Sequence, residues 1–125
     1  MQKFIIALAL VVGVLWASGT VCDAKNITYK CDFKNNNGGD TLSITFIEDD
    51  IAKKAYMTGN AGTEEVSPVT TPIQKAFIEV TSAGNITVTT IFTSKNIFGE
   101  AVHSRHMDVV GNASSQYFGT CKVMP

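Results

Sequence analysis

The chain has 125 residues, with 10 basic and 11 acidic side chains and a formal net charge of −1. A near-neutral chain without a basic stripe has no electrostatic footprint for nucleic acid or for an anionic membrane surface, so we expect neither as a partner. This length fits one domain with a single hydrophobic core.

The N-terminal residues have the pattern of a secretory signal peptide. A single lysine precedes an apolar run from Phe4 to Ala17, which is too short to span a bilayer comfortably. Small residues permit cleavage after Gly19 or after Ala24, and we favour Ala24. We therefore expect a signal peptide at residues 1–24, one β-barrel-like domain at 25–125, and a periplasmic or secreted protein.

The cysteine count agrees with this cleavage site. Loss of Cys22 with the signal leaves Cys31 and Cys121, an even pair that can form a disulfide in an oxidising compartment. The alternative is a lipidated Cys22, but Val21 precedes it, where a lipoprotein signal normally has a small residue.

The first half of the mature chain reads as strands separated by turns. Residues 27–34 alternate with period two, which predicts a half-buried strand, and the Asn- and Gly-rich segment 35–40 predicts a hairpin turn. The return strand is expected at 41–48, followed by a solvated acidic turn at Glu48 to Asp50. Residues 51–58 fit either a strand or one helical turn, and we favour the strand. The side chains expected to point inward are Ile27, Tyr29, Cys31, Phe33, Leu42, Ile44, Phe46, Ala55 and Met57.

The next segments continue this pattern after a turn at Gly59 to Gly62. Residues 63–72 can form at most a short or edge strand, because Pro68 and Pro72 cannot donate to a ladder. Residues 74–81 and 86–94 form a predicted hairpin, the second strand being almost entirely β-branched. In the first of these strands we expect Ala76, Ile78 and Val80 to point inward.

The last strands are expected at 101–108 and 116–123, and Tyr117, Cys121 and Val123 share one face of the final strand. Seven or eight short strands without a helix predict an all-β antiparallel meander, either a barrel or a sandwich. Cys31 and Cys121 lie on the apolar faces of the first and last strands. A disulfide between them favours a small closed barrel, which also removes exposed edges.

The strand at 101–108 carries polar groups on both faces, which is unusual for this chain. Alternation places His103 and Arg105 on one face, and Ser104, His106 and Asp108 on the other. These residues are the candidates for a ligand-binding site: His103, Ser104, Arg105 and His106.

Three kinds of chemistry fit the residue types of this strand. A Ser104–His106–Asp108 triad is disfavoured, because alternate residues of one strand are about 6.6 Å apart. A metal site is disfavoured because the two histidines, His103 and His106, face opposite ways. Recognition of an anion by Arg105 with His103 remains open. It competes with a purely structural role, in which Arg105 pairs with Glu79 or Glu100 and the histidines bind turn carbonyls.

Three sequons, at Asn26, Asn85 and Asn112, permit glycosylation if the source is eukaryotic.

The segments GNITVTTI, AVHSRH and SQYFGTC resemble a group of small exported proteobacterial proteins that have no assigned activity. That resemblance implies the same cleavage site and the same disulfide.

A second resemblance covers only the two ends of the mature chain. The opening ITYKCDF and the cysteine in the last strand are similar to periplasmic inhibitors of c-type lysozyme, which are eight-stranded barrels. Their Ser-Gly-x-x-Tyr motif is missing from this sequence. We expect a non-enzymatic binding or structural module of the cell envelope without a cofactor. It would bind a small ligand, an envelope component or a protein, and the alternative is a lysozyme inhibitor-like protein acting through surface loops.

Overall fold

The computed structural model describes residues 26–60, 62–106 and 114–125 of the chain. The predicted signal peptide, Cys22, Asp108 and Asn112 lie outside the described residues. Within the described residues there is no helix long and apolar enough to cross a membrane. The strands are β1 (Asn26–Asn35), β2 (Thr41–Asp49), β3 (Lys54–Gly59), β4 (Gly62–Thr70), β5 (Gln74–Val80), β6 (Ile86–Phe92), β7 (Glu100–His106) and β8 (Ser114–Met124).

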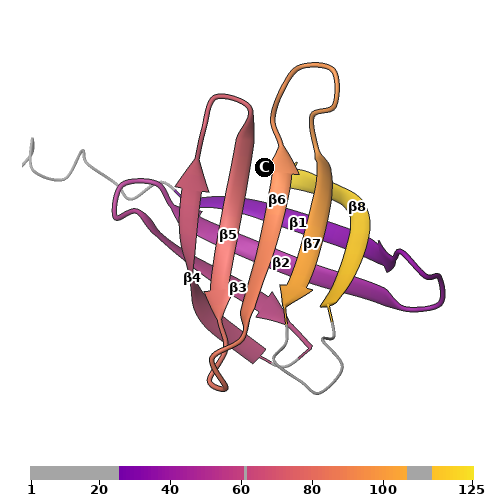
Figure 1. The fold of residues 1–125 in the computed structure, drawn as a ribbon. Coiled ribbons are helices and arrows are strands. Elements are labelled where there is room, and N and C mark those ends of the chain that lie inside the picture. The colour runs from indigo at the N-terminus through magenta and orange to yellow at the C-terminus, as the bar shows by residue number, and fades with distance from the viewer. Residues whose placement is uncertain (1–25, 61, 107–113) are drawn as a thin grey trace, which may run out of the picture.

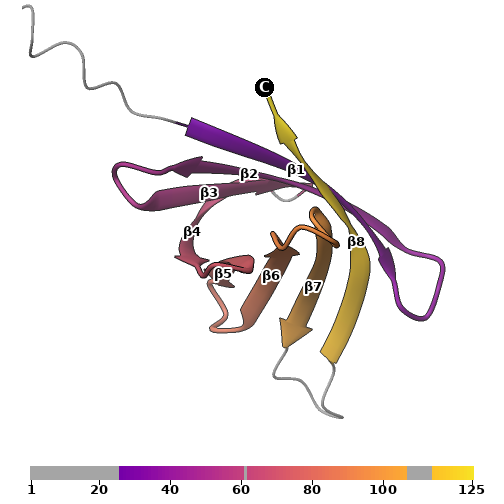
Figure 2. The ribbon, with the colours of Figure 1, turned by 90° about the horizontal axis from the view of Figure 1, so that it is seen from above.

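The eight strands form a closed antiparallel barrel in sequence order, in which β8 returns to pair with β1. Figure 1 shows β4 to β7 side by side across the front, while β1 and β2 cross behind them at a steep angle. The view from above separates the same two layers, with β8 curving from one to the other (Figure 2). The predicted all-β meander and its closure into a barrel are confirmed.

The β1–β2 hairpin is where the asparagine- and glycine-rich segment predicts it. Gly38 and Gly39 have φ angles of 77° and 105°, a backbone conformation that residues with a Cβ rarely adopt. The turn sets the register in which Cys31 faces Ile44 and Phe33 faces Leu42. The inward face predicted for these two strands is therefore confirmed.

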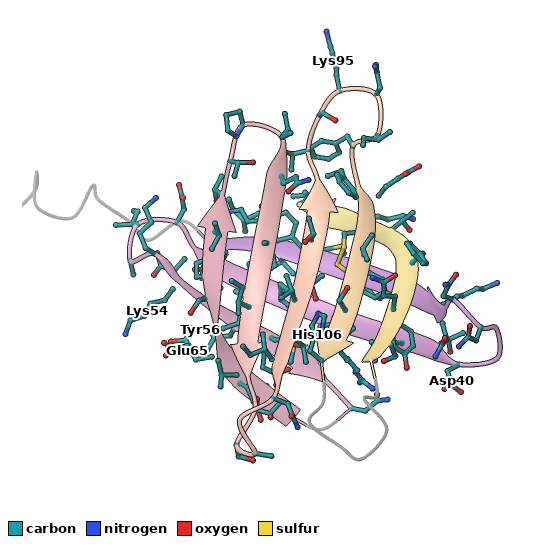
Figure 3. The ribbon with its side chains drawn as sticks, viewed as in Figure 1. Asp40, Lys54, Tyr56, Glu65, Lys95 and His106 are labelled. Carbon is teal, nitrogen blue, oxygen red and sulfur yellow. A yellow bond between two sulfur atoms is a disulfide. The ribbon has the colours of Figure 1, made fainter. Side chains whose placement is uncertain are left out.

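The barrel is closed by a disulfide between its first and last strands. Cys31 and Cys121 are directly opposed in the β1–β8 ladder and are covalently linked. Both are buried, at 0% and 6% exposure, so the bridge belongs to the core. Figure 3 shows it as the yellow bond behind β6 and β7.

Close to this bridge, Gly119 lets β8 lie directly on β1. A Cβ at Gly119 would collide with the carbonyl oxygen of Asp32 and would lie 2.8 Å from the Cα of Phe33. Its partner on the other side is Ala101 of β7, another small residue. The curve of β8 across the two layers therefore depends on the absence of a side chain at this position.

A layer of aromatic side chains fills the middle of the barrel. The Phe46 and Phe77 rings stack with centroids 4.3 Å apart, and Tyr29 meets Phe77 edge-on at 5.7 Å. Such pairs contribute about 0.5 to 1.5 kcal/mol each beyond the area they bury. This layer separates the two ends of the barrel interior.

The predicted orientation of β5 is wrong. Lys75, Phe77 and Glu79 point into the barrel, whereas Val80 is 65% exposed and Ala76 and Ile78 are half-buried on the outer surface. Alternation reads a strand correctly but does not say which face turns inward when both faces carry apolar residues. Here the interior takes two charged side chains because both find polar partners there.

The acidic turn is also predicted incorrectly at its first residue. Glu48 belongs to β2, continues the inward face of Phe46 and is only 2% exposed. Its Oε2 lies 2.7 Å from the Nζ of Lys75, which is itself 7% exposed. The ion pair compensates in part for burying both charges, since Oε1 of Glu48 has no hydrogen-bond partner in the described structure, and only Asp49 and Asp50 lead into the turn.

Residues 62–70 form a full nine-residue strand rather than a short edge strand. β4 pairs with β3 as far as Val66 and with β5 from Ser67 onward. Pro68 therefore has a ladder on one side only, which explains why a proline is tolerated in a closed barrel.

We predict that replacing both Cys31 and Cys121 by serine lowers the free energy of unfolding by about 4 to 5 kcal/mol, because the bridge closes a loop with a sequence separation of 90 residues. Urea denaturation of the oxidised protein and of the double variant measures this difference. Two titratable thiols in the native oxidised protein, or an unchanged midpoint, would contradict the pairing.

Gly119→Ala should lower the free energy of unfolding by about 3 kcal/mol or more, because the new methyl group forces β1 and β8 apart. The matched control is Gly59→Ala, since a Cβ at Gly59 meets nothing within 4 Å. Thermal and urea unfolding of both variants would test the idea. Equal small effects would show that β8 can shift to accommodate the methyl group.

Candidate functional site

A row of polar side chains crosses three neighbouring strands inside the barrel. In the ladder, Glu79 of β5 is opposite Thr87 of β6, and Thr87 is opposite Arg105 of β7. The Thr87 hydroxyl donates a hydrogen bond of 2.9 Å to Oε1 of Glu79. Inward-facing residues at one level of adjacent strands are neighbours, so the row places an acid and a guanidinium two strands apart.

A second carboxyl group joins this row from β4. Glu64, which is exposed, lines the same cavity as Glu79, which is 9% exposed, and the two carboxyl groups are close enough to interact electrostatically. The pKa of Glu79 is raised above its usual 4.5, first by burial and then by Glu64, while Thr87 and Arg105 act in the opposite direction. Glu79 therefore holds a proton more readily than an isolated glutamate would.

His103 lies deeper, on the same face of β7 as Arg105. It is 2% exposed, and its Nδ1 lies 2.7 Å from the Thr89 hydroxyl. The rings of Phe33 and Tyr117 lie 5.8 and 5.9 Å from it. Burial, with a smaller contribution from Arg105, lowers the pKa of His103 to about 4. The imidazole is therefore neutral near pH 7, and its buried Nε2 has no hydrogen-bond partner in the described structure.

Arg105 does not form the ion pair expected for a structural arginine. The described residues contain two ion pairs, Lys53–Asp50 and Lys75–Glu48, and neither includes Arg105. Its guanidinium instead lies 5.5 Å from the centre of the Tyr117 ring, in a cation–π contact. The pairing expected with Glu79 or Glu100 is thus absent from the described residues, and His103 binds a hydroxyl group rather than a turn carbonyl.

These polar groups line a cavity of about 320 Å³ at the end of the barrel where β3 meets β4 and β5 meets β6. Leu42, Ile44 and Met57 form an apolar part of its wall. The full lining is Leu42, Ile44, Met57, Gly59, Asn60, Gly62, Glu64, Glu79, Thr81, Asn85, Thr87, His103 and Arg105.

The structure divides the four residues proposed from sequence into two pairs. His103 and Arg105 turn inward and line the cavity. Ser104 and His106 lie on the outer face of β7, where Ser104 is half-buried and His106 is exposed (Figure 3). A site in this cavity can therefore include His103 and Arg105, whereas Ser104 and His106 lie outside the cavity.

Sequence reasoning missed Glu64, Glu79 and Thr87 as cavity residues. Two of them belong to the strands whose orientation or length was misjudged, β4 and β5. The sequence does contain a sign of the true orientation of β5. Lys75, Phe77 and Glu79 alternate as regularly as the apolar residues Ala76, Ile78 and Val80, which are predicted to point inward. Charged residues at alternate positions opposite β-branched partners can face inward when a polar cluster receives them.

No group of three or more histidine, cysteine, aspartate or glutamate side chains in the described part of the chain could hold a metal ion. Comparisons with protein-family models, with curated proteins and with solved structures found no match to this chain. The functional argument consequently depends on the geometry of the cavity.

We predict that lowering the pH reduces the contribution of the His103 side chain to the free energy of unfolding. Its pKa is about 4 in the folded protein and about 6.5 when unfolded, so the unfolded chain binds more protons between these values. The stability advantage over His103→Gln is complete above about pH 6.5 and should shrink by about 3 kcal/mol on lowering the pH to about 4.

Urea unfolding at a series of pH values measures this difference. The control variant is His106→Gln, which removes an exposed imidazole from the outer face of the same strand. A His103→Gln curve parallel to that of the unmodified protein would contradict the neutral buried imidazole.

Proposed function

We propose that this is an exported, non-enzymatic protein that binds a small ligand in the cavity formed by β2 to β7. The observation that carries this proposal is the convergence of Glu64, Glu79, Thr87 and Arg105, from four neighbouring strands, on one cavity with an apolar wall. A few polar groups set in an otherwise apolar concave surface are the usual features of a ligand site.

The size of the cavity supports a small ligand rather than a polymer. A volume of about 320 Å³ lies at the lower end of the roughly 300 to 1,000 Å³ typical of ligand pockets. An eight-stranded barrel has an interior just wide enough for packed side chains or one small molecule. The aromatic layer fills the middle, which leaves room only towards the end that holds the cavity.

An unsatisfied polar atom gives independent support. Nε2 of His103 is buried without a hydrogen-bond partner in the described structure, and the residue is part of the cavity wall. Most buried polar atoms in native proteins are paired with protein or water. Two such atoms lack a partner in the described residues, Glu48 Oε1 and His103 Nε2, and of these only His103 belongs to the cavity lining. A molecule bound in the cavity would supply the missing partner of Nε2.

Binding fits the geometry better than catalysis does. Glu64 and Glu79 both line the cavity, but Glu64 is exposed and Glu79 already accepts a hydrogen bond from the Thr87 hydroxyl. His103 is neutral, and the hydroxyl that its Nδ1 contacts belongs to Thr89, which is 1% exposed and so offers a substrate no accessible nucleophile.

Export is supported by the chain itself. The buried Cys31–Cys121 bridge suits an oxidising compartment, and the apolar N-terminal segment is typical of a secretory signal.

The barrel fold also suits the alternative, a lysozyme inhibitor-like protein. The β1–β2 hairpin, whose tip at residues 36–40 is exposed, extends beyond the rest of the barrel (Figure 2).

The cavity proposal predicts that Met57→Trp abolishes small-molecule binding, because a larger inward side chain fills the space beside Leu42 and Ile44. Tyr56→Trp is the matched control, since Tyr56 points outward on the same strand (Figure 3). A fragment collection of cationic, neutral and anionic compounds is screened by two-dimensional NMR against all three proteins. Shifts should cluster at cavity residues, persist in Tyr56→Trp and vanish in Met57→Trp.

Two results would count against cavity binding. One is the absence of any fragment that perturbs the cavity residues. The other is inhibition of a c-type lysozyme that survives both His103→Ala and Arg105→Ala, since it would assign the function to surface loops. If Met57→Trp fails to fold, Leu42→Trp fills the same cavity from β2.

A further inference from the structure

We propose that the ligand of this cavity carries a primary ammonium group on a short apolar body, and that the ammonium binds between the carboxyl groups of Glu64 and Glu79. This inference rests on the proposed function and specifies the class of ligand. It follows from a comparison of the two ends of the barrel interior.

At the opposite end, the chain supplies its own alkylammonium group to an interior carboxylate. The Nζ of Lys75 lies 2.7 Å from Oε2 of Glu48, and both side chains are almost fully buried. The methylene stem of the lysine packs inside the barrel while its charge is neutralised by the acid. This barrel therefore already accommodates a primary amine with an apolar stem.

The cavity end has the acids without the amine. Glu64 and Glu79 meet there, yet no lysine belongs to the cavity lining among the described residues. Arg105 lies two strands from Glu79, forms neither of the described ion pairs and is stacked against Tyr117. A single alkylammonium ion would occupy the position that Lys75 has relative to Glu48.

The charge balance agrees with a monocation. With both carboxyl groups ionised, two carboxylates and one guanidinium leave one negative charge, since the His103 imidazole is neutral. An anionic ligand would add to that charge in a partly desolvated site, where like charges repel strongly. Recognition of an anion by Arg105 and His103 is therefore the less favourable use of this cavity.

The apolar wall determines the rest of the ligand. Leu42, Ile44 and Met57 lie on β2 and β3, opposite the polar row on β5 to β7. A molecule held by its ammonium group between Glu64 and Glu79 would place its other atoms against these three side chains. An unbranched alkyl chain or a small ring satisfies this geometry.

The ammonium group binds the ionised form of Glu79 more strongly than the protonated form. The proton that Glu79 holds more tightly because of burial and Glu64 is then released, so the affinity for an amine should rise with pH. The other charged or titratable groups in the cavity lining are Arg105 and His103, and His103 is neutral well above pH 4. A rise in affinity at pH values above the ordinary pKa of 4.5 would therefore report on Glu79.

The test compares three isosteric probes, hexylamine, 1-hexanol and hexanoate, titrated into the disulfide-bonded protein by NMR in buffers free of amines. Hexylamine should bind at least about tenfold more tightly than either other probe. Glu79→Gln should lower its affinity about tenfold and remove the pH dependence while changing the affinity for 1-hexanol less than about twofold. Glu65→Gln is the control, since Glu65 is exposed beside Tyr56 on the outer surface (Figure 3).

Different failures separate this inference from the proposed function. Equal affinities for hexylamine and 1-hexanol, or preferential binding of hexanoate that Arg105→Gln abolishes, would overturn the amine and leave the cavity as a ligand site. If no probe binds but fragments of another class shift the cavity residues, only the ligand class is wrong. If Glu79→Gln does not fold, Glu64→Gln at the rim takes its place in the same comparison.

Discussion

Closure of the barrel between β1 and β8 is the constraint on which the rest of the structure depends. A meander of eight strands buries both edges only if the last strand returns to the first, and here that contact is fixed by the Cys31–Cys121 bridge and by the bare backbone at Gly119. With the circle closed, each strand has one face committed to a narrow interior. The orientation of β5 and β7, and hence the content of the cavity, follows from this shared interior.

The interior is organised as an apolar layer between two polar ends. The buried side chains of Phe46, Phe77 and Tyr29 occupy the middle. On one side the Glu48–Lys75 pair neutralises itself. On the other side the acids meet a cavity instead of a lysine, and this asymmetry is the physical basis for assigning a ligand to that end.

The orientation of β5 also has a consequence outside the barrel. Ile78 pairs with Val88 and Val80 pairs with Ile86, so apolar side chains cover part of the outer surface of β5 and β6. The same alternation that brings Lys75, Phe77 and Glu79 inside places these residues outside. In a strand with two mixed faces, the choice is made by the partners available within the barrel, since Glu48 and Thr87 satisfy the charges that β5 carries inward.

The sequence by itself determined the strands, the hairpin turns and the disulfide, because period-two alternation, glycine-rich turns and an even cysteine pair are local signals. It also singled out His103 and Arg105 as rare polar residues of one face. Only the tertiary structure decided that this face turns inward and that Glu64 and Glu79 meet it across the barrel. That decision depends on register and closure, which bring together side chains from strands separated by tens of residues, and no local pattern encodes such contacts.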